Sequence, residues 1–172
     1  MFIYIGTTQS LRVSQEKPKV KLYLTVGIPG AGKTTWVQEK LSHSCEVVAL
    51  DKIRKGIYGF FPQKLNDDLE KIVWERALIL AKTFLESRDD TVIDSMALTK
   101  FFRNKIISTI KAQCKIEFDL IAIFFDTPID LAIERNSKRE KYVNESTIRM
   151  LQTYLEKPLK EEGFKEVIYI KP

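Results

Sequence analysis

The chain has 172 residues, of which 44% are hydrophobic and 10% aromatic, enough to bury one core and to predict a single domain. The net charge is +5, from 28 Lys and Arg residues against 23 Asp and Glu residues, a modest basic excess that suits a polyanionic partner. No apolar run approaches the roughly 20 residues needed to span a membrane. The opening Met1 to Ile5 lacks the basic flank and length of a signal peptide, so we expect a cytoplasmic protein.

Cysteine and histidine are too sparse for the chemistry they usually support. The two cysteines, Cys45 and Cys114, have neither metal-ligand spacing nor a disulfide framework, so we expect ordinary thiols. His43 is the single histidine and follows a predicted helix, where a solvated turn is the expected setting. Histidine-based catalysis is therefore not expected.

In chain order, residues 1–19 are polar and aperiodic, which predicts a loose extension, with Met1 to Ile5 as a candidate edge strand. From residue 20 to 172 one domain is predicted, in which strand-like and helix-like stretches alternate. The expected strands are 20–26, 46–50, 91–94, one within 116–125, and 167–170. The expected helices are 33–41, 51–58, one from 66 or 67, 100–113, 128–141 and 145–157. Apolar strands alternating with helices predict an α/β fold with three layers and a mainly parallel sheet of about five strands.

Two of these elements allow more detailed predictions. In the long helix after residue 66, Asp67 and Glu70 have capping-box spacing. Apolar residues at helical spacing predict a face that packs on the sheet: Leu69, Ile72, Val73, Ala77, Leu80 and Phe84. The strand within 116–125 is the longest apolar run, which predicts a central position in the sheet.

Between the first strand and the first helix lies Gly27-Ile28-Pro29-Gly30-Ala31-Gly32-Lys33-Thr34-Thr35, a match to the G-x-x-x-x-G-K-[ST] phosphate-binding loop. Its glycines allow successive N–H groups to face one point, and the start of the following helix adds its dipole. Lys33 is placed for the β- and γ-phosphates of ATP, and the Thr34 hydroxyl for Mg²⁺. The alternative is a glycine turn without a ligand. The motif predicts a nucleotide-binding P-loop domain of the kinase type.

In a parallel sheet, ligands bind beyond the carboxyl ends of the strands, so we inspected the residues that follow each strand. Asp51 follows the second strand with Arg54 one helical turn later, so a carboxylate that could accept a proton lies beside a guanidinium that could bind an acceptor phosphate. A helix cap with a solvated partner is the alternative. Asp94 ends the third strand, where P-loop proteins hold Mg²⁺ directly or through water. Its alternative role is to satisfy loop N–H groups.

The basic run from Arg135 to Lys141 offers a further candidate site. Arg135 and Arg139 have i, i+4 spacing, so on a helix both guanidinium groups would project from one face and repel each other unless an anion lay between them. This favours a lid over the nucleotide phosphates. A solvated charged face is the alternative.

With these residues in order, the sequence resembles polynucleotide 5′-hydroxyl kinases of the phage and bacterial end-healing type. The resemblance covers about residues 20 to 171, and nothing in the chain matches the phosphatase module of the phage enzyme. The segments that carry it are Leu24 to Trp36, Leu50-Asp51-Lys52-Ile53-Arg54, Val92-Ile93-Asp94, Phe125-Asp126-Thr127-Pro128 and Glu134-Arg135-Asn136-Ser137-Lys138-Arg139.

This resemblance implies a role for each matched residue. Lys33 and Thr34 would bind ATP and Mg²⁺, and Asp51 would be the general base on the 5′-hydroxyl group. Arg54 would contact the acceptor phosphate, and Arg135 with Arg139 would form the phosphate lid. The implied partner is a nucleic-acid 5′ end, either RNA or DNA.

Three functions follow from the sequence. The first is an ATP-dependent kinase for polynucleotide 5′-hydroxyl ends. The second is the same reaction on a small metabolite or nucleotide, because zeta-toxin-like and small-molecule kinases share the loop, the aspartate and an arginine lid. The third is a nucleotide-binding protein without transfer, against which the intact Asp51 argues.

Overall fold

A computed structural model of the chain describes residues 19–59, 67–140 and 142–172. The predicted extension therefore lies, apart from Lys19, outside the described residues. At the start of the domain the Lys19 ammonium contacts the Glu117 carboxylate at 2.8 Å. No helix in the described part of the chain is long and apolar enough to cross a membrane.

Five parallel strands form one sheet in the order β2-β3-β1-β4-β5. Their bounds are β1 Val20–Val26, β2 Glu46–Ala49, β3 Thr91–Asp94, β4 Phe118–Phe125 and β5 Glu166–Ile170. The predicted α/β class and parallel sheet are confirmed. The longest apolar run, β4, lies in the interior of the sheet between β1 and β5, which agrees with the predicted central position, and β1 is the middle strand. Both are interior strands. A long apolar run indicates that a strand is buried on both faces, but it does not indicate the order of the strands in the sheet.

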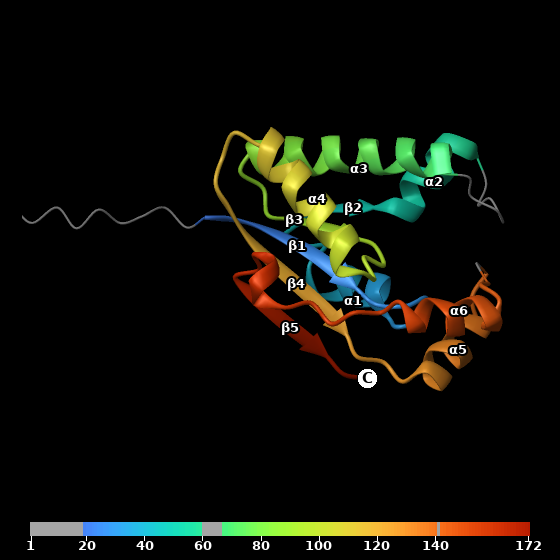
Figure 1. Cartoon of the computed structure of the whole chain (residues 1–172). Coiled ribbons are helices and arrows are strands. Elements are labelled where there is room, and N and C mark those ends of the chain that lie inside the picture. The colour runs from blue at the N-terminus through green and yellow to red at the C-terminus, as the bar shows by residue number, and fades with distance from the viewer. Residues whose placement is uncertain (1–18, 60–66, 141) are drawn as a thin grey trace, which may run out of the picture.

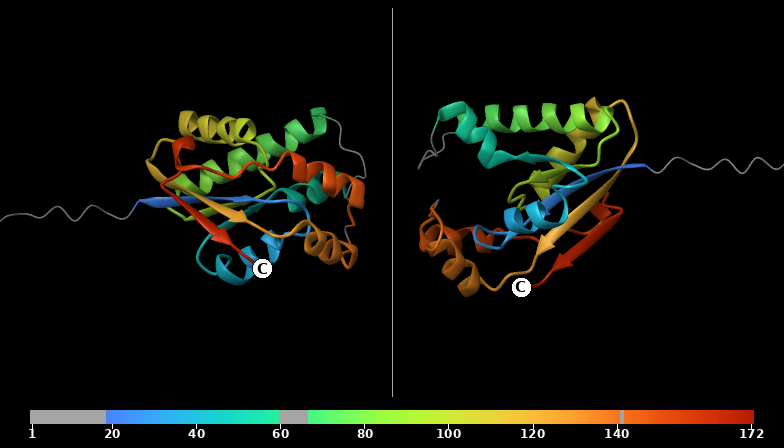
Figure 2. Two further views of the ribbon diagram at one scale, coloured as in Figure 1. Left: turned by 60° about the horizontal axis from the view of Figure 1, so that its bottom comes forward. Right: turned by 180° about the vertical axis from the view of Figure 1, so that it is seen from behind.

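Helices cover both faces of this sheet, as Figures 1 and 2 show. One face carries α2, α3 and α4, and the other carries α1, α5 and α6. The helices are α1 Lys33–Lys40, α2 Leu50–Tyr58, α3 Asp67–Glu86, α4 Lys100–Gln113, α5 Ile129–Ser137 and α6 Glu145–Thr153, with a short 3₁₀ turn, η1, over Lys160–Glu162. The fold is thus the predicted three-layer arrangement.

Alternation along the strands divides the core between the two faces. In β1, Leu22 and Leu24 join the core cluster under α3 and α4, whereas Tyr23 between them packs with the cluster under α1 and α5. In β4, Phe124 and Phe125 divide in the same way. Successive side chains of a strand point to opposite faces, so an unbroken apolar run supplies both cores.

The buried face of α3 agrees with the prediction at two positions and differs from it at others. Val73 and Ala77 are buried as expected, but Ile72 and Leu80 are 43% and 39% exposed. The stripe continues instead through Ala81 and Leu85, both fully buried. Small alanines every fourth residue let this helix lie close to the sheet, which a pattern scored on large apolar residues overlooks.

Candidate active site

The phosphate-binding loop connects β1 to α1 and is held against its neighbours at several points. Gly30 has a φ of +80°, and a β-carbon there would lie 2.0 Å from the carbonyl oxygen of Ala132 in α5, so no other residue fits. The Thr127 hydroxyl donates to the carbonyl of Ala31 at 3.0 Å, and the Gly27 N–H donates to the carbonyl of Met96 at 3.0 Å. The loop is therefore a preformed cradle.

Lys33 and Thr34 form the first turn of α1, directly after the loop. The Lys33 ammonium donates to the carbonyls of Gly27 and Ile28 at 2.9 and 2.8 Å. The Thr34 hydroxyl donates to Asp94 Oδ2 at 2.7 Å, and Asp94 is itself buried at the end of β3. A hydroxyl and a carboxylate this close are the oxygen ligands that Mg²⁺ takes from P-loop proteins. These residues therefore fit the ion.

Asp94 is positioned by a side chain of β1. The Thr25 hydroxyl donates to the carbonyl of Ser95 at 2.8 Å and accepts from the Ser95 N–H at 2.9 Å. It also approaches Asp94 Oδ1 at 3.4 Å. This buried contact fixes the end of β3 beside the loop. The buried Ser95 hydroxyl has no hydrogen-bond partner among the described residues.

On the other side of the loop, Arg54 joins two carboxylates. Its Nε and Nη2 atoms donate to the two oxygens of Glu70 at 2.7 Å each, and Nη1 donates to Asp51 Oδ1 at 2.7 Å. Burial by itself would lower the pKa of Arg54, but the hydrogen bonds and charges of Glu70 and Asp51 outweigh it and raise the pKa. Arg54 thus remains charged and holds Asp51 and Glu70 together.

Glu70 has a contact that its sequence position did not predict. The predicted capping box assigned its carboxylate to the start of α3, yet both oxygens accept from Arg54, which lies 16 residues earlier. The fork geometry of an arginine–carboxylate pair provides two charge-assisted bonds where a cap provides one. Among the described residues, Arg54 donates to carboxylates through three of its five N–H groups.

Of the two arginines predicted to form a lid, Arg135 lies beside the phosphate loop and Arg139 lines the cleft described below, but they do not share one helix. An Nη1 atom of Arg135 lies 3.7 Å from the position of a β-carbon on Gly32. The helix α5 ends at Ser137, so the expectation of helix through residue 141 is wrong and Arg139 follows in a turn. The buried side chain of Asn136 donates to the carbonyl of Val143 at 2.7 Å and accepts from its N–H at 3.3 Å, which turns the chain back.

A cleft of about 1870 Å³ connects these groups. Its walls include Lys33 and Thr34 after the loop, Asp51 and Arg54 of α2, and Arg139, which follows α5. Further parts of the wall come from α3, from the length of α4, and from the segment between Tyr142 and Tyr154 that contains α6. The predicted donor-side and acceptor-side residues therefore share one cavity.

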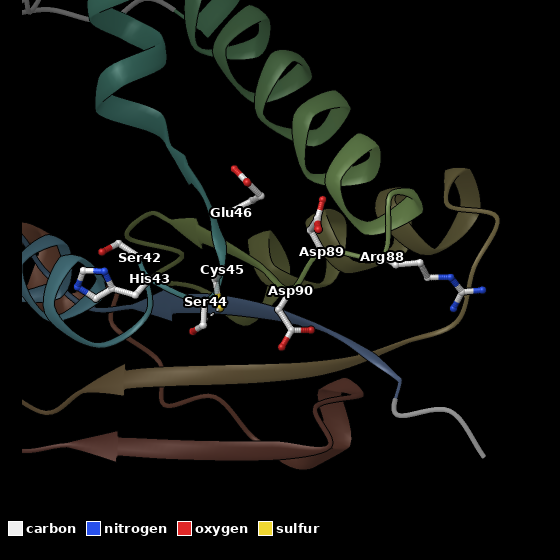
Figure 3. Close-up of a pocket in the computed structure, with 8 residues that line it drawn as sticks. All are labelled: Ser42, His43, Ser44, Cys45, Glu46, Arg88, Asp89 and Asp90. Carbon is white, nitrogen blue, oxygen red and sulfur yellow. Dashed lines mark hydrogen bonds between the residues drawn. The ribbon is translucent and has the colours of Figure 1, made fainter. Parts of the chain in front are cut away.

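A separate hollow of about 410 Å³ lies at the opposite end of the sheet, where β2 and β3 begin (Figure 3). It contains His43 and Cys45, and in Figure 3 the side chain of Arg88 points away from them. Burial raises the pKa of the Cys45 thiol, which disfavours the reactive thiolate. Both cysteines are free, which agrees with the expectation of ordinary thiols.

The fold and this site define a P-loop α/β domain of the kinase type. A family model described as an AAA domain matches residues 22–158, and the chain belongs to this family. No curated protein sequence matches the chain.

Solved structures resemble the chain in fold at low sequence identity. A chain of the Pnkp1/Rnl/Hen1 RNA repair complex superposes with a TM-score of 0.68 at 20% identity, over 83% of this chain and 46% of that one. A fungal RNA kinase has a TM-score of 0.63 at 18% identity, over 90% and 75% of the two chains. A gluconokinase from Sinorhizobium meliloti 1021 has a TM-score of 0.56 at 17% identity, over 90% and 84%. The chain thus spans less than half of the RNA repair protein.

Proposed function

We propose that the protein transfers the γ-phosphoryl group of ATP to the 5′-hydroxyl end of a polynucleotide. Phosphoryl transfer requires positioning and charge stabilisation more than covalent chemistry by the protein, and the cleft supplies groups for both. The observation that carries the proposal is that Asp51 and Arg54, the proposed acceptor-side residues, line the same cleft as Lys33 and Thr34 of the phosphate loop.

On the donor side, the N–H groups of the loop and the ammonium of Lys33 bind the phosphates of ATP. Lys33 exchanges the carbonyls of Gly27 and Ile28 for phosphate oxygens as ATP enters. Thr34 and Asp94 would hold Mg²⁺, which supplies charge neutralisation on the β- and γ-phosphates.

On the acceptor side, Asp51 takes the proton of the attacking hydroxyl group. Its contact with Arg54 at 2.7 Å fixes the direction of the carboxylate before the acceptor binds. The guanidinium of Arg54 binds the phosphate that follows the terminal nucleoside. Arg135 and Arg139 stabilise the charge that develops on the transferring group.

The fold comparisons lend support of two kinds. Chains of an RNA repair complex and of an RNA kinase share this architecture, which agrees with a nucleic-acid acceptor. A gluconokinase shares it too. The second candidate, a kinase for a small hydroxyl compound, is favoured by the carboxylates of Asp68 and Glu75 along the α3 wall, which would repel a long polyanion.

The test is an acceptor screen with γ-labelled ATP and Mg²⁺. We expect label on oligonucleotides with a 5′-hydroxyl end and none on the same oligonucleotides carrying a 5′-phosphate. Nucleosides and sugar acids serve as small acceptors in parallel. Label on a small hydroxyl compound but on no oligonucleotide would replace the first proposal with the second.

A further inference from the structure

Aromatic rings that the core does not use gather along the same cleft. Phe101 is 80% exposed, Tyr142 is 56% exposed and Tyr154 is 54% exposed, and all three line the cavity that contains Thr34 and Asp94. Large apolar side chains left in solvent around a functional cavity mark a binding surface more often than isolated ones do. We call Phe101, Tyr142 and Tyr154 the aromatic rim.

The exposure of Phe101 is not shared by the next residue, Phe102. Phe102 packs edge-on against Trp74 of α3, with ring centroids 4.8 Å apart, and belongs to the core. Phe101, one residue earlier on α4, turns its ring outward. Two rings of this rim lie on adjacent segments, because the Glu156 N–H, just after Tyr154, donates to the carbonyl of Leu98 at 3.0 Å.

The charge of α4 matches an anionic ligand. The helix carries Lys100, Lys105 and Lys111 and has no Asp or Glu in its sequence, and Lys105 is the lysine of α4 that lines the cleft. Its remaining cation, Arg103, is buried and paired with Glu162, so it does not reach the cleft. Lys105 follows Phe101 by four residues, which places the two side chains on one face, and both line the cleft.

From these observations we propose that the aromatic rim and Lys105 bind the nucleotides that follow the 5′ end of a single-stranded acceptor. Bases stack on the rings of Phe101 and Tyr154, and Lys105 contacts the backbone phosphate between them. Rings combined with lysines along a groove are the usual means of holding single strands without sequence preference. The rim residues and Lys105 line the same cavity as Thr34 and Asp94 of the proposed transfer site. This inference rests on the proposed polynucleotide kinase function.

The first experiment varies the length of the acceptor and the aromatic ring at position 101. Steady-state kinetics are measured with a 5′-hydroxyl dinucleotide and a dodecamer for the wild type, Phe101→Leu and Phe101→Trp. Because leucine keeps apolar bulk but has no ring, Phe101→Leu should raise the KM for the dodecamer about tenfold with little change in kcat. Phe101→Trp should retain the wild-type KM.

The matched control is Ile79→Ala on α3, since Ile79 is 58% exposed and is not among the residues that line the cleft. This variant should have the KM of the wild type for the dodecamer.

A second measurement follows binding of a fluorescent, 5′-phosphorylated dodecamer by anisotropy over a range of salt concentrations. Lys105→Ala should reduce the slope of log affinity against log salt by about 0.7, the loss of one phosphate contact on a single strand.

Each outcome has a distinct meaning. If the wild type phosphorylates both acceptors with equal KM and Phe101→Leu changes nothing, the rim proposal is wrong and the kinase function stands. If Phe101→Trp loses as much as Phe101→Leu, stacking is not the interaction, and the rim serves another partner. If the wild type labels no oligonucleotide at all, the proposed function fails, and the rim proposal fails with it.

Discussion

The proposed base provides the clearest test at the scale of one residue. Asp51→Asn preserves the shape of the side chain and removes its ability to accept a proton, so turnover should fall about 10²-fold or more. ATP affinity, measured by calorimetry, should stay close to that of the wild type. Asp130→Asn, at an exposed position of α5, is the matched control. Unchanged turnover with reduced thermal stability would mean that Asp51, in the first turn of α2, serves only as a structural partner of Arg54.

A second residue-scale prediction separates binding from structure at Arg54. Arg54→Ala removes the proposed acceptor contact and also removes the cation that lies between the carboxylates of Asp51 and Glu70. Both the acceptor affinity and the melting temperature should therefore fall. In the double variant Arg54→Ala with Glu70→Gln, the melting temperature should recover while the acceptor KM remains high. Recovery of both would show that Arg54 acts only as a structural bridge.

At the scale of elements, the loop depends on its close approach to α5. Gly30→Ala would place a β-carbon 2.0 Å from the carbonyl oxygen of Ala132, so the loop and the helix must separate. We expect ATP affinity to fall about tenfold or more, as overpacking of this kind costs roughly 1–3 kcal/mol. Gly56→Ala is the matched control, because a β-carbon on Gly56 in α2 would meet no atom within 4 Å.

The control variant Gly56→Ala also has an expected effect on stability, which is measured by equilibrium unfolding in urea. Alanine in a helix is more stable than glycine by roughly 0.5–1 kcal/mol, so Gly56→Ala should raise the free energy of unfolding by that amount. Gly30→Ala should not raise it. If both variants bind ATP like the wild type, the contact between the loop and α5 is not needed for nucleotide binding.

At the scale of the whole molecule, one buried ion pair connects distant segments. Arg103 and Glu162 are fully buried and form two hydrogen bonds at 2.7 and 2.8 Å. Arg103 also donates to the carbonyls of Ala97, Leu98 and Glu156, so it ties the loop after β3 to the end of the chain. The carbonyl of Met96 in that loop accepts from Gly27, which links this pair to the phosphate loop.

Removing one partner of this pair should therefore affect both stability and the site. Arg103→Met leaves a buried, unpaired carboxylate and should lower the free energy of unfolding by about 3–5 kcal/mol, measured in urea. Replacing both partners, with Arg103→Met and Glu162→Leu, should restore much of that loss. A single variant as stable as the wild type would show that Glu162 finds another partner or becomes exposed.

Local patterns determined much of this protein. Alternating apolar runs and helical periodicity placed β1, β3 and α4 at their observed bounds, because backbone geometry and burial repeat over a few residues. The spacing of the phosphate loop located Lys33 and Thr34 for the same reason. The topology of a parallel sheet then explains why Asp51 and Asp94, which follow two different strands, line one cleft.

Tertiary packing decided the contacts that no local pattern contains. Glu70 has the spacing of a helix cap, yet it binds Arg54, because α2 and α3 lie side by side and a two-bond pair with a guanidinium is stronger than a cap. Arg139 has helical spacing from Arg135, yet it lies in a turn, because the buried Asn136 binds the backbone of Val143. Phe101 and Phe102 are the same amino acid in sequence, and only the position of Trp74 makes one a core residue and leaves the other in the cleft.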